Sequence, residues 1–458
     1  MLLIERELDV PAYKGDSSLL AYFEEGIREH LGVDGMPIRF AVTRSDSNGY
    51  HCELGVITGL DDPNSSQPTS IFEYVPRRVE NTNEFNAVAI APTGIGCEIG
   101  GHAGDAGPVA RLLARACDTL MTHPNFVNSA DINELPENGL YVEGSVLSQL
   151  LMGTVGLQKV RANRVMLVID KHQEEQISDF AINAVSAARA SLGLECPLVV
   201  EMEKPIRMRA RYSTSGSAVG RVEGLERLCK ILRQRRDDYD AVALASVIDV
   251  PKDFHMKYFQ SHGEMVNPWG GIEAMLTHAV SMMFGVPSAH SPMMESMDVL
   301  NLNVGVVDPR MSAEAISTGF LHSVLKGLHR SPRIITDKTV FTHPGVLTAA
   351  DVSCLVIPDG CVGLPTLAAL EQGIPVIAVR ENRNCMKNDL ERLPFHPGRL
   401  FIVENYLEAV GVMTALKAGV SVPSVRRPLA ATKVSCEHDE VHREEGSKVN
   451  EAATPANT

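Results

Sequence analysis

From residue 87 onward, short apolar runs alternate with amphipathic helical segments, and this alternation constrains the fold more than any other feature of the sequence. The apolar runs predict strands at 87–91, 119–122, 164–169, 197–200, 241–247, 353–357, 375–379 and 400–403. The segments between them predict helices at 106–117, 145–152, 173–192, 220–235, 271–284, 312–328, 365–372 and 406–418. Unpatterned strands separated by helices are typical of parallel sheets covered on both faces. We therefore expect an α/β fold with Rossmann-like parallel sheets flanked by helices.

Changes in the pattern of apolar, polar and glycine residues along the chain predict its domain organisation. Residues 1–85 read as a small α/β N-terminal unit, with a helix at 17–31 and strands at 39–43 and 51–58. Two strand–glycine loop–helix units predict two lobes, a main α/β domain at 86–345 and a second α/β lobe at 346–428. The polar, aperiodic stretch 429–458 is expected to be a disordered tail.

Charge and cysteine usage exclude several classes of protein. The 458 residues carry 42 Lys and Arg against 57 Asp and Glu, a net charge of −15 that repels nucleic acid and anionic membrane surfaces. No apolar run approaches the ~20 residues of a membrane span. The nine cysteines form no CxxC pair, so neither a disulfide framework nor a zinc ribbon is expected. We therefore expect a reducing, cytoplasmic setting. We also expect a homo-oligomer, because most oligomers of soluble proteins are of this kind.

The first loop with chemical potential spans 92–108, after a predicted strand and before a helix. Its glycines allow the backbone to approach a ligand, and its free amides would attract an anion. The spacing matches neither a dinucleotide fingerprint nor a P-loop. A plain turn in which Asp105 caps the next helix is the structural alternative. The candidate residues for binding are Thr93, Gly94, Gly96, Gly100, Gly101 and Asp105, and the candidates for proton transfer are Glu98 and His102.

The second loop, 122–138, also follows a predicted strand. His123, Asn125 and Asn128 are expected at the carboxyl end of a parallel sheet, where ligands bind in this architecture. Asn-rich loops also serve as turns and caps. Glu143 precedes the next helix as either an acid/base group or a first-turn carboxylate.

A third region, 246–290, is rich in histidine and acidic residues. It contains Asn267, the single tryptophan Trp269, Gly271 and His290, which we take as ligand-binding candidates. Glu273 and His278 are five residues apart, so they lack the i, i+4 spacing of helical zinc ligands. A metal site built from distant His and Asp residues stays open, and the metal is unknown.

The fourth loop, 358–366, again joins a strand to a helix. Cys361 would lie near a helix N-terminus that lowers a thiol's pKa, although a small buried cysteine is the structural alternative. Asp359 is a second acid/base candidate. Arg380 and Arg383 follow the next strand and could bind a carboxylate or phosphate.

Long phrases of these loops resemble one uncharacterised bacterial family, domain of unknown function 3326. The phrases are PTGIGCEIGGHAGD, THPNFVNSADINELPENGLYVEGSV, GEMVNPWGGIEAMLTHA, VPSAHSPM and VIPDGCVGLPTLAALEQGIPVIAVRENRN. The resemblance covers about residues 75 to 428 and implies no assigned reaction, cofactor or catalytic residue. In similar chains the position of Cys97 is expected often to hold alanine, which favours Cys361 over Cys97 as a reactive thiol.

The leading hypothesis is an enzyme of small-molecule metabolism that uses acid/base chemistry on a small anionic substrate, an amino acid or carboxylic acid. Lyase, isomerase or racemase reactions would suit it, and a racemase with thiols Cys97 and Cys361 is one version. No sequence motif requires a cofactor. One alternative is a nucleotide- or nucleotide-sugar-dependent transferase with Glu371 on a ribose. Others are a non-catalytic metabolite-binding protein and a metal hydrolase.

Overall fold

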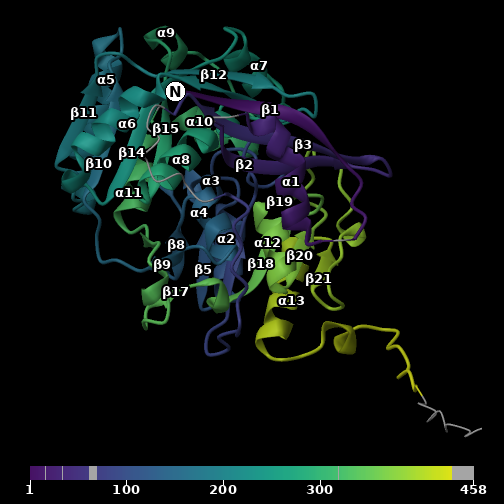
Figure 1. Ribbon diagram of the computed structural model, residues 1–458. Helices are drawn as coiled ribbons and strands as arrows, with labels where there is room; N and C mark the ends of the chain where they lie inside the picture. The colour runs from purple at the N-terminus through teal and green to yellow at the C-terminus, as the bar shows by residue number, and fades with distance from the viewer. Residues whose placement is uncertain (16, 33–34, 61–69, 318, 436–458) are drawn as a thin grey trace, which may run out of the picture.

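Two large sheets with helices packed against them form most of the described part of the protein, and the computed structural model is drawn in Figure 1. It describes all residues except 16, 33–34, 61–69, 318 and 436–458. Residues 429–435 are exposed and carry neither helix nor strand. The rest of the expected tail lies outside the described residues. No helix in the described part of the chain combines the length and the apolar character that crossing a membrane requires.

The larger sheet is mixed and has ten strands in the order β11-β10-β14-β12-β13-β1-β3-β2-β19, with β15 also paired to β14. Strands β10, β11, β14 and β15 are mutually parallel, and β1, β2, β3 and β13 pair antiparallel. The strands are β1 Leu2–Pro11, β2 Met36–Ser45, β3 Gly49–Thr58, β10 Val165–Asp170, β11 Leu198–Met202, β12 Arg207–Tyr212, β13 Ala218–Glu223, β14 Ala241–Asp249, β15 Ser288–Met293 and β19 Val362–Gly363.

The second sheet has six strands, all parallel, in the order β21-β20-β18-β4-β5-β8. Its strands are β4 Asn86–Ala89, β5 Thr119–Thr122, β8 Gly139–Tyr141, β18 Val352–Pro358, β20 Val376–Val379 and β21 Leu400–Val403. Strands β4, β5, β18 and β20 are buried along their whole length. This burial explains why the sequence shows apolar runs here and no alternation.

Helices cover both sheets and fill the space between them. They are α1 Leu19–Leu31, α2 Gly107–Arg115, α3 Pro124–Val127, α4 Gly144–Leu151, α5 Glu175–Leu192, α6 Leu225–Gln234, α7 Phe254–Gln260, α8 Gly270–Phe284, α9 Met297–Leu300, α10 Ser312–Ile316, α11 Leu321–His329, α12 Leu364–Gln372 and α13 Tyr406–Lys417. Short strands complete the fold: β6 Asn128–Ser129 pairs with β7 Ile132–Asn133, and β9 Gly156–Gln158 pairs with β16 Arg333–Ile335 and β17 Val346–Leu347. Helix α8 lies between the two large sheets in Figure 1 and contacts β13 and β15 of the larger sheet and helix α4.

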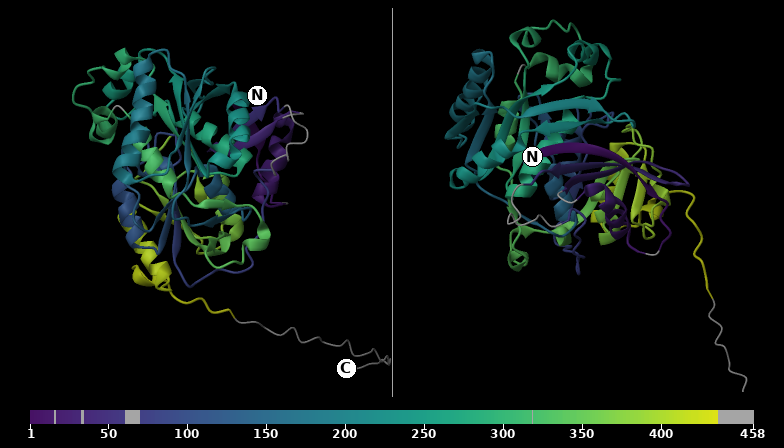
Figure 2. Two further views of the ribbon diagram at one scale, coloured as in Figure 1. Left: turned by 90° about the vertical axis from the view of Figure 1, so that its left-hand side faces the viewer. Right: turned by 45° about the horizontal axis from the view of Figure 1, so that its top comes forward.

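The sheets do not follow the expected domain boundaries. The N-terminal strands β1 and β2 pair with β13 and β19, so residues 1–85 form part of the large sheet (Figure 2, purple). In the parallel sheet, strands β21, β20 and β18 from after the 345/346 boundary continue the sheet of β4, β5 and β8 from before it, and β18 pairs with β4. Segments distant in sequence thus build each sheet together.

Most predicted elements are present, and two helix predictions are wrong. The predicted strands all exist with ends shifted by no more than a few residues. The helix expected over 220–235 begins only at Leu225, because the preceding residues belong to strand β13. The helix expected over 312–328 is two helices, α10 and α11. Strand β13 forms a hairpin with the preceding strand β12 and also pairs with β1, which is remote in sequence.

Candidate active site

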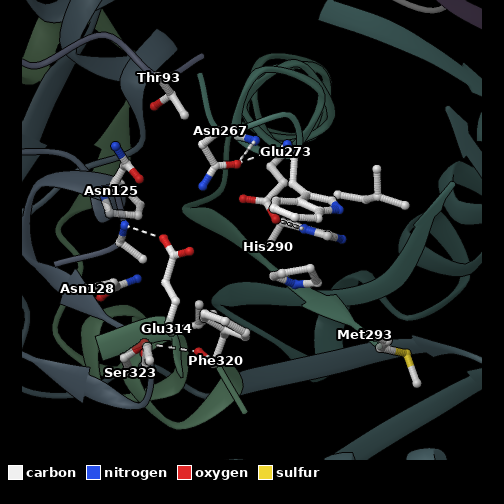
Figure 3. A pocket seen from close by; sticks show the side chains of 18 of the residues that line it. Thr93, Asn125, Asn128, Asn267, Glu273, His290, Met293, Glu314, Phe320 and Ser323 are labelled. Atoms are coloured by element: carbon white, nitrogen blue, oxygen red, sulfur yellow. Dashed lines mark hydrogen bonds and ion pairs between the residues drawn. The ribbon is translucent and has the colours of Figure 1, made fainter. Parts of the chain in front are cut away.

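A cavity of about 230 Å³ opens where carboxyl ends of parallel strands from both sheets face each other. Strands β4, β5 and β8 lead into the loops that bring Thr93, His123 and Glu143 to it, and β15 brings His290. Figure 3 shows side chains from separate segments pointing into this space. The predicted site residues among its lining are Thr93, His123, Asn125, Asn128, Glu143, Asn267, Trp269 and His290.

Glu143 and His278 form a hydrogen-bonded carboxylate–imidazole pair in the wall of this cavity. Nδ1 of His278 contacts Oε1 of Glu143, and Thr277 Oγ1 donates to the same oxygen at 3.1 Å. The other oxygen accepts the backbone N–H of Ser145 at 2.9 Å, which also caps helix α4. Burial alone would raise the pKa of Glu143, but the His278 ring and the Ser145 donors hold the pKa below its usual range. Glu143 is therefore both a helix cap and an ionised partner of His278.

His278 keeps one ring nitrogen for a ligand. With Nδ1 bonded to Glu143, Nε2 has no hydrogen-bond partner among the described residues, and the side chain is 15% exposed. The residue lines the cavity and follows Ala274 by one turn on helix α8. A carboxylate that fixes one imidazole nitrogen and leaves the other free is the arrangement of a general base.

His123 is a neutral imidazole in the same wall. Its Nε2 accepts the backbone N–H of Ala91 at 3.1 Å, which makes Nδ1 the nitrogen that carries hydrogen. Burial lowers the pKa of His123 to about 4, against the opposing attraction of Glu143. The ring is therefore a hydrogen-bond donor at neutral pH.

Burial favours the uncharged, protonated form of the Glu314 carboxyl. Burial raises the pKa of Glu314 to about 7, although the backbone N–H of Ala103 donates to it at 2.7 Å. The Tyr258 hydroxyl lies 3.3 Å from Glu314 Oε1 and 2.7 Å from His102 Nδ1. His102 does not line the cavity and reaches Glu314 only through Tyr258, so it is placed to position Glu314 rather than to touch a substrate.

Acidic and aromatic side chains form the opposite part of the lining. His290 Nε2 is 2.8 Å from Ser246 Oγ, and its Nδ1 is 3.5 Å from Glu273 Oε1. His255 Nε2 is 3.0 Å from Glu295 Oε2, and its ring lies 4.9 Å from that of Trp269. The lining has no lysine or arginine among the described residues. In the part of the chain that the structure describes, no group of three or more His, Cys, Asp and Glu side chains is arranged to hold a metal ion.

A second cavity of about 160 Å³ lies on the other side of the same wall. Thr93, His123, Gly144, Ala274 and His278 line both cavities. The remaining lining is mostly apolar and includes Ile38, Phe40, Ile90, Met282, Val362 and Leu364. The imidazoles therefore stand between two cavities. We call the first the polar cavity because it holds the histidine, asparagine and glutamate side chains, although apolar residues also line it.

Cys361 lines only this second cavity, and its expected activation is wrong. Burial raises the pKa of the Cys361 thiol instead of lowering it, and the neighbouring Cys385 and Asp359 raise it further. Cys97 is also buried, lines neither cavity, and has a raised pKa. Neither thiol is prepared as a thiolate.

Several backbone amides of the 92–108 loop donate hydrogen bonds to other protein groups. Gly100 N donates to Asp105 Oδ1 at 2.8 Å and Ile99 N donates to Asn382 Oδ1 at 2.9 Å. Glu98 N and Ala103 N are likewise bonded. These amides are not free for an anion. Asp105 holds the loop instead of capping α2, whose start has no side-chain cap, and burial raises the pKa of Asp105 to about 7.

Close packing leaves no room for a side chain at the candidate glycines, as Gly271 and Gly94 illustrate. A Cβ on Gly271 would lie 1.8 Å from the carbonyl oxygen of Ala218 in β13. Gly94, at φ +79°, would place a Cβ 2.9 Å from the same oxygen. These contacts seat the first turn of α8 and the glycine loop against the large sheet. Gly96 and Gly101 also lie outside the cavity lining.

The remaining candidates lie away from the cavities. Arg380 pairs with Glu404 at 2.8 Å, and Asp359 is 3.9 Å from Arg380. Arg383 is mostly exposed, 3.6 Å from Glu98, which also pairs with Arg310 at 2.8 Å. Glu371 Oε1 accepts the backbone N–H of Leu19 and does not line either cavity. The structure thus does not bring these groups to the cavity.

Sequence reasoning missed His278, Glu314, Glu273 and Glu295 as site residues. The sequence did carry a signal for Glu273 and His278. Together with Thr277 they are polar residues in helix α8, which is otherwise buried on most sides. Polar residues in such a helix need partners, which points to a site. Glu314 carried no such signal because its burial depends on contacts with Tyr258 and Ala103.

Comparisons with known proteins confirm the expected resemblance. A family model described as "Protein of unknown function (DUF3326)" matches residues 86–426. An uncharacterized lipoprotein of Synechococcus sp. is 33% identical over 343 residues, which cover 73% of this chain and 92% of that protein. No solved structure matches the chain. The matched region contains the residues that line the polar cavity.

Proposed function

This chain belongs to the DUF3326 family, and we propose that it is an enzyme that moves protons on a small polar metabolite, as an isomerase, racemase or lyase does. The single observation that carries the proposal is the buried Glu143 carboxylate on Nδ1 of His278, whose Nε2 is left without a partner among the described residues beside a cavity. A histidine on the protein surface would not need a buried carboxylate to fix its ring.

The proposed chemistry assigns each group one step. Nε2 of His278 takes a proton from the substrate, and Glu143 stabilises the imidazolium that forms. The Nδ1–H of neutral His123 donates to the oxygen on which negative charge develops. Glu314, with a pKa of about 7, gives a proton to a second position on the substrate. His278 then releases its proton to solvent and Glu314 regains one from solvent, which restores both groups.

The substrate class in this proposal differs from the anionic class expected from sequence. That expectation rested on free loop amides, Arg380 and Arg383. The amides of residues 98, 99, 100 and 103 bond other protein groups, and neither arginine lines the cavity. An amino acid remains a candidate because it carries an ammonium group. A simple carboxylate would face Glu143, Glu273, Glu295 and Glu314 without a lysine or arginine in the described lining.

Proton exchange tests the proposal, because it detects activity on any compound of a mixture. The full chain is incubated in D₂O with mixtures of amino acids, amines, hydroxy acids and sugars, and mass spectrometry detects deuterium on carbon. We expect one compound class to gain deuterium with wild type. His278→Gln should lose the signal by about 100-fold or more.

A matched control separates chemistry from general damage. His396→Gln changes an exposed histidine and should retain full exchange. Exchange that survives in His278→Gln removes this residue from the mechanism. Binding of a metabolite without exchange or conversion would favour the alternative of a non-catalytic binding protein.

Three broader expectations remain proposals. The all-parallel sheet and the parallel set β11-β10-β14-β15 support Rossmann-like lobes. A cytoplasmic setting is supported by the free cysteines Cys52, Cys97, Cys117, Cys196, Cys229, Cys354, Cys361 and Cys385, whereas the Synechococcus relative is called a lipoprotein. Fractionation of the native host tests the location, and light scattering tests the proposed homo-oligomer.

A further inference from the structure

One wall of the polar cavity combines carboxylates with an aromatic face. Helix α8 begins with Trp269 as its cap and places Glu273 one turn later. The Trp269 ring packs 4.9 Å from the ring of His255, which in turn contacts Glu295 at 3.0 Å. We call Trp269, Glu273, Glu295, His255 and His290 the Trp269 wall.

This wall contains buried polar atoms that lack partners. Oε1 of Glu273, Oε1 of Glu295 and Nδ1 of His290 are buried and make no hydrogen bond with the described residues. His290 is 8% exposed, and its residue lines the cavity. Its Nδ1 lies 3.5 Å from Glu273 Oε1, too far for a good hydrogen bond. Unpaired buried acceptors are costly, so a ligand that donates hydrogen bonds is the natural partner.

We propose that the Trp269 wall binds a protonated amine of the substrate. An ammonium group supplies several N–H donors, which match the carboxylates of Glu273 and Glu295, whose side chains line the cavity and are 23% and 24% exposed. The Trp269 ring adds the attraction of an aromatic face for a cation. The charge balance agrees, since the described lining holds four glutamates and no lysine or arginine. The assignment deepens the proposed function and rests on it for the identity of this cavity as the substrate site.

Helix α8 also sets the distance between the amine and the proposed base. Glu273 and His278 are five positions apart on one helix, a rise of about 7.5 Å. A ligand that spans both groups therefore has its amine several bonds from the reacting position. Small diamines and basic or amino-substituted metabolites fit this requirement better than a simple alkyl alcohol.

The single tryptophan makes binding directly measurable. Trp269 is the only tryptophan of the chain and lies in the wall, so its emission reports occupancy. The full chain is titrated with butane-1,4-diamine, butylamine, butanol and sodium butanoate at constant ionic strength and pH. The diamine should saturate the emission change at a concentration about tenfold below that for butanol, and butanoate should give none.

Variants locate the site. Glu273→Gln and Glu295→Gln should each raise the half-saturating diamine concentration by about tenfold, since each removes one charge from the wall. Glu264→Gln, at an exposed residue of the neighbouring loop, should leave it unchanged. Far-UV circular dichroism and melting of each variant establish that the fold is retained.

The outcomes separate the two proposals. Equal binding of butanol, tighter binding of butanoate, or no response to either amine overturns the cation site. Amine binding that depends on Glu273, in a protein that shows no deuterium exchange, keeps the cation site and overturns the enzyme. Exchange of a substrate without an amine keeps the enzyme and overturns the cation site.

Discussion

Glu143 and His278 are 135 residues apart in sequence, yet they share a hydrogen bond in the wall between two cavities. Glu143 follows the parallel strand β8, and His278 lies on helix α8, which packs against the larger sheet. The pair therefore joins the two sheets at the place where a ligand would bind. Its chemistry and the packing of the fold are coupled.

Replacing Glu143 with Gln should lower stability in a pH-dependent way. The pKa of Glu143 is depressed below its ordinary value of 4.5, so its contribution is complete above that pH and is lost as pH falls through the folded-state pKa. At pH 7 the variant should lose roughly 3 kcal/mol, because a buried partner of His278 is removed. Urea unfolding at pH 7 and pH 4 measures this, and the difference should shrink at pH 4. Glu137→Gln, at an exposed carboxylate, is the control, and an equal loss at both pH values would contradict the depressed pKa of Glu143.

Replacing Glu314 with Gln should have the opposite pH dependence. The pKa of Glu314 is raised by burial to about 7, so its neutral form is favoured in the folded state. Wild type should lose stability from Glu314 as pH rises from about 4.5 through 7, whereas the variant should not. The variant should gain about 3 kcal/mol relative to wild type between pH 5 and pH 8.5. A constant difference across this range, measured by urea unfolding, would show that Glu314 is ionised throughout.

The thiols of the folded protein should react slowly. Burial raises the pKa of Cys361 and of Cys97, so thiolate is scarce and access requires opening of the fold. With Cys436, which lies outside the described residues, replaced by Ser, iodoacetamide should label half-buried Cys385 first. Cys361 should react at least about 100-fold more slowly than in the unfolded chain. Peptide mass spectrometry measures each rate, and fast labelling of Cys361 would restore it as a nucleophile.

Alanine at Gly271 should be strongly destabilising. Its Cβ would lie 1.8 Å from the carbonyl oxygen of Ala218, so α8 must shift away from β13. We expect a loss of about 3 kcal/mol or more in the free energy of unfolding. Gly411→Ala is the matched control in helix α13, where a Cβ meets nothing within 4 Å, and it should stabilise by about 0.5–1 kcal/mol. Thermal melting of both variants distinguishes close packing from helix propensity, and a neutral Gly271→Ala would contradict the contact.

Part of the candidate site could be predicted from sequence. Thr93, His123, Asn125 and Glu143 all reach the polar cavity, because the rule that ligands bind at carboxyl ends of parallel strands needs only the order of strands and loops. The same rule placed Cys361 and Arg380 at loops of the right kind but could not orient them. Cys361 faces the apolar cavity, and Arg380 pairs with Glu404.

The sequence by itself determined the alternation of buried strands and helices, the family, and the loops in which polar groups gather, because these depend on local composition and periodicity. Only the tertiary structure decided that β4 and β18 share a sheet, that His278 receives Glu143, and that Glu314 is buried beside Tyr258. Those relationships arise from contacts between residues far apart in the chain. Solvent exclusion and hydrogen-bond geometry, which set the pKa of a carboxyl or thiol, exist only once such contacts have formed.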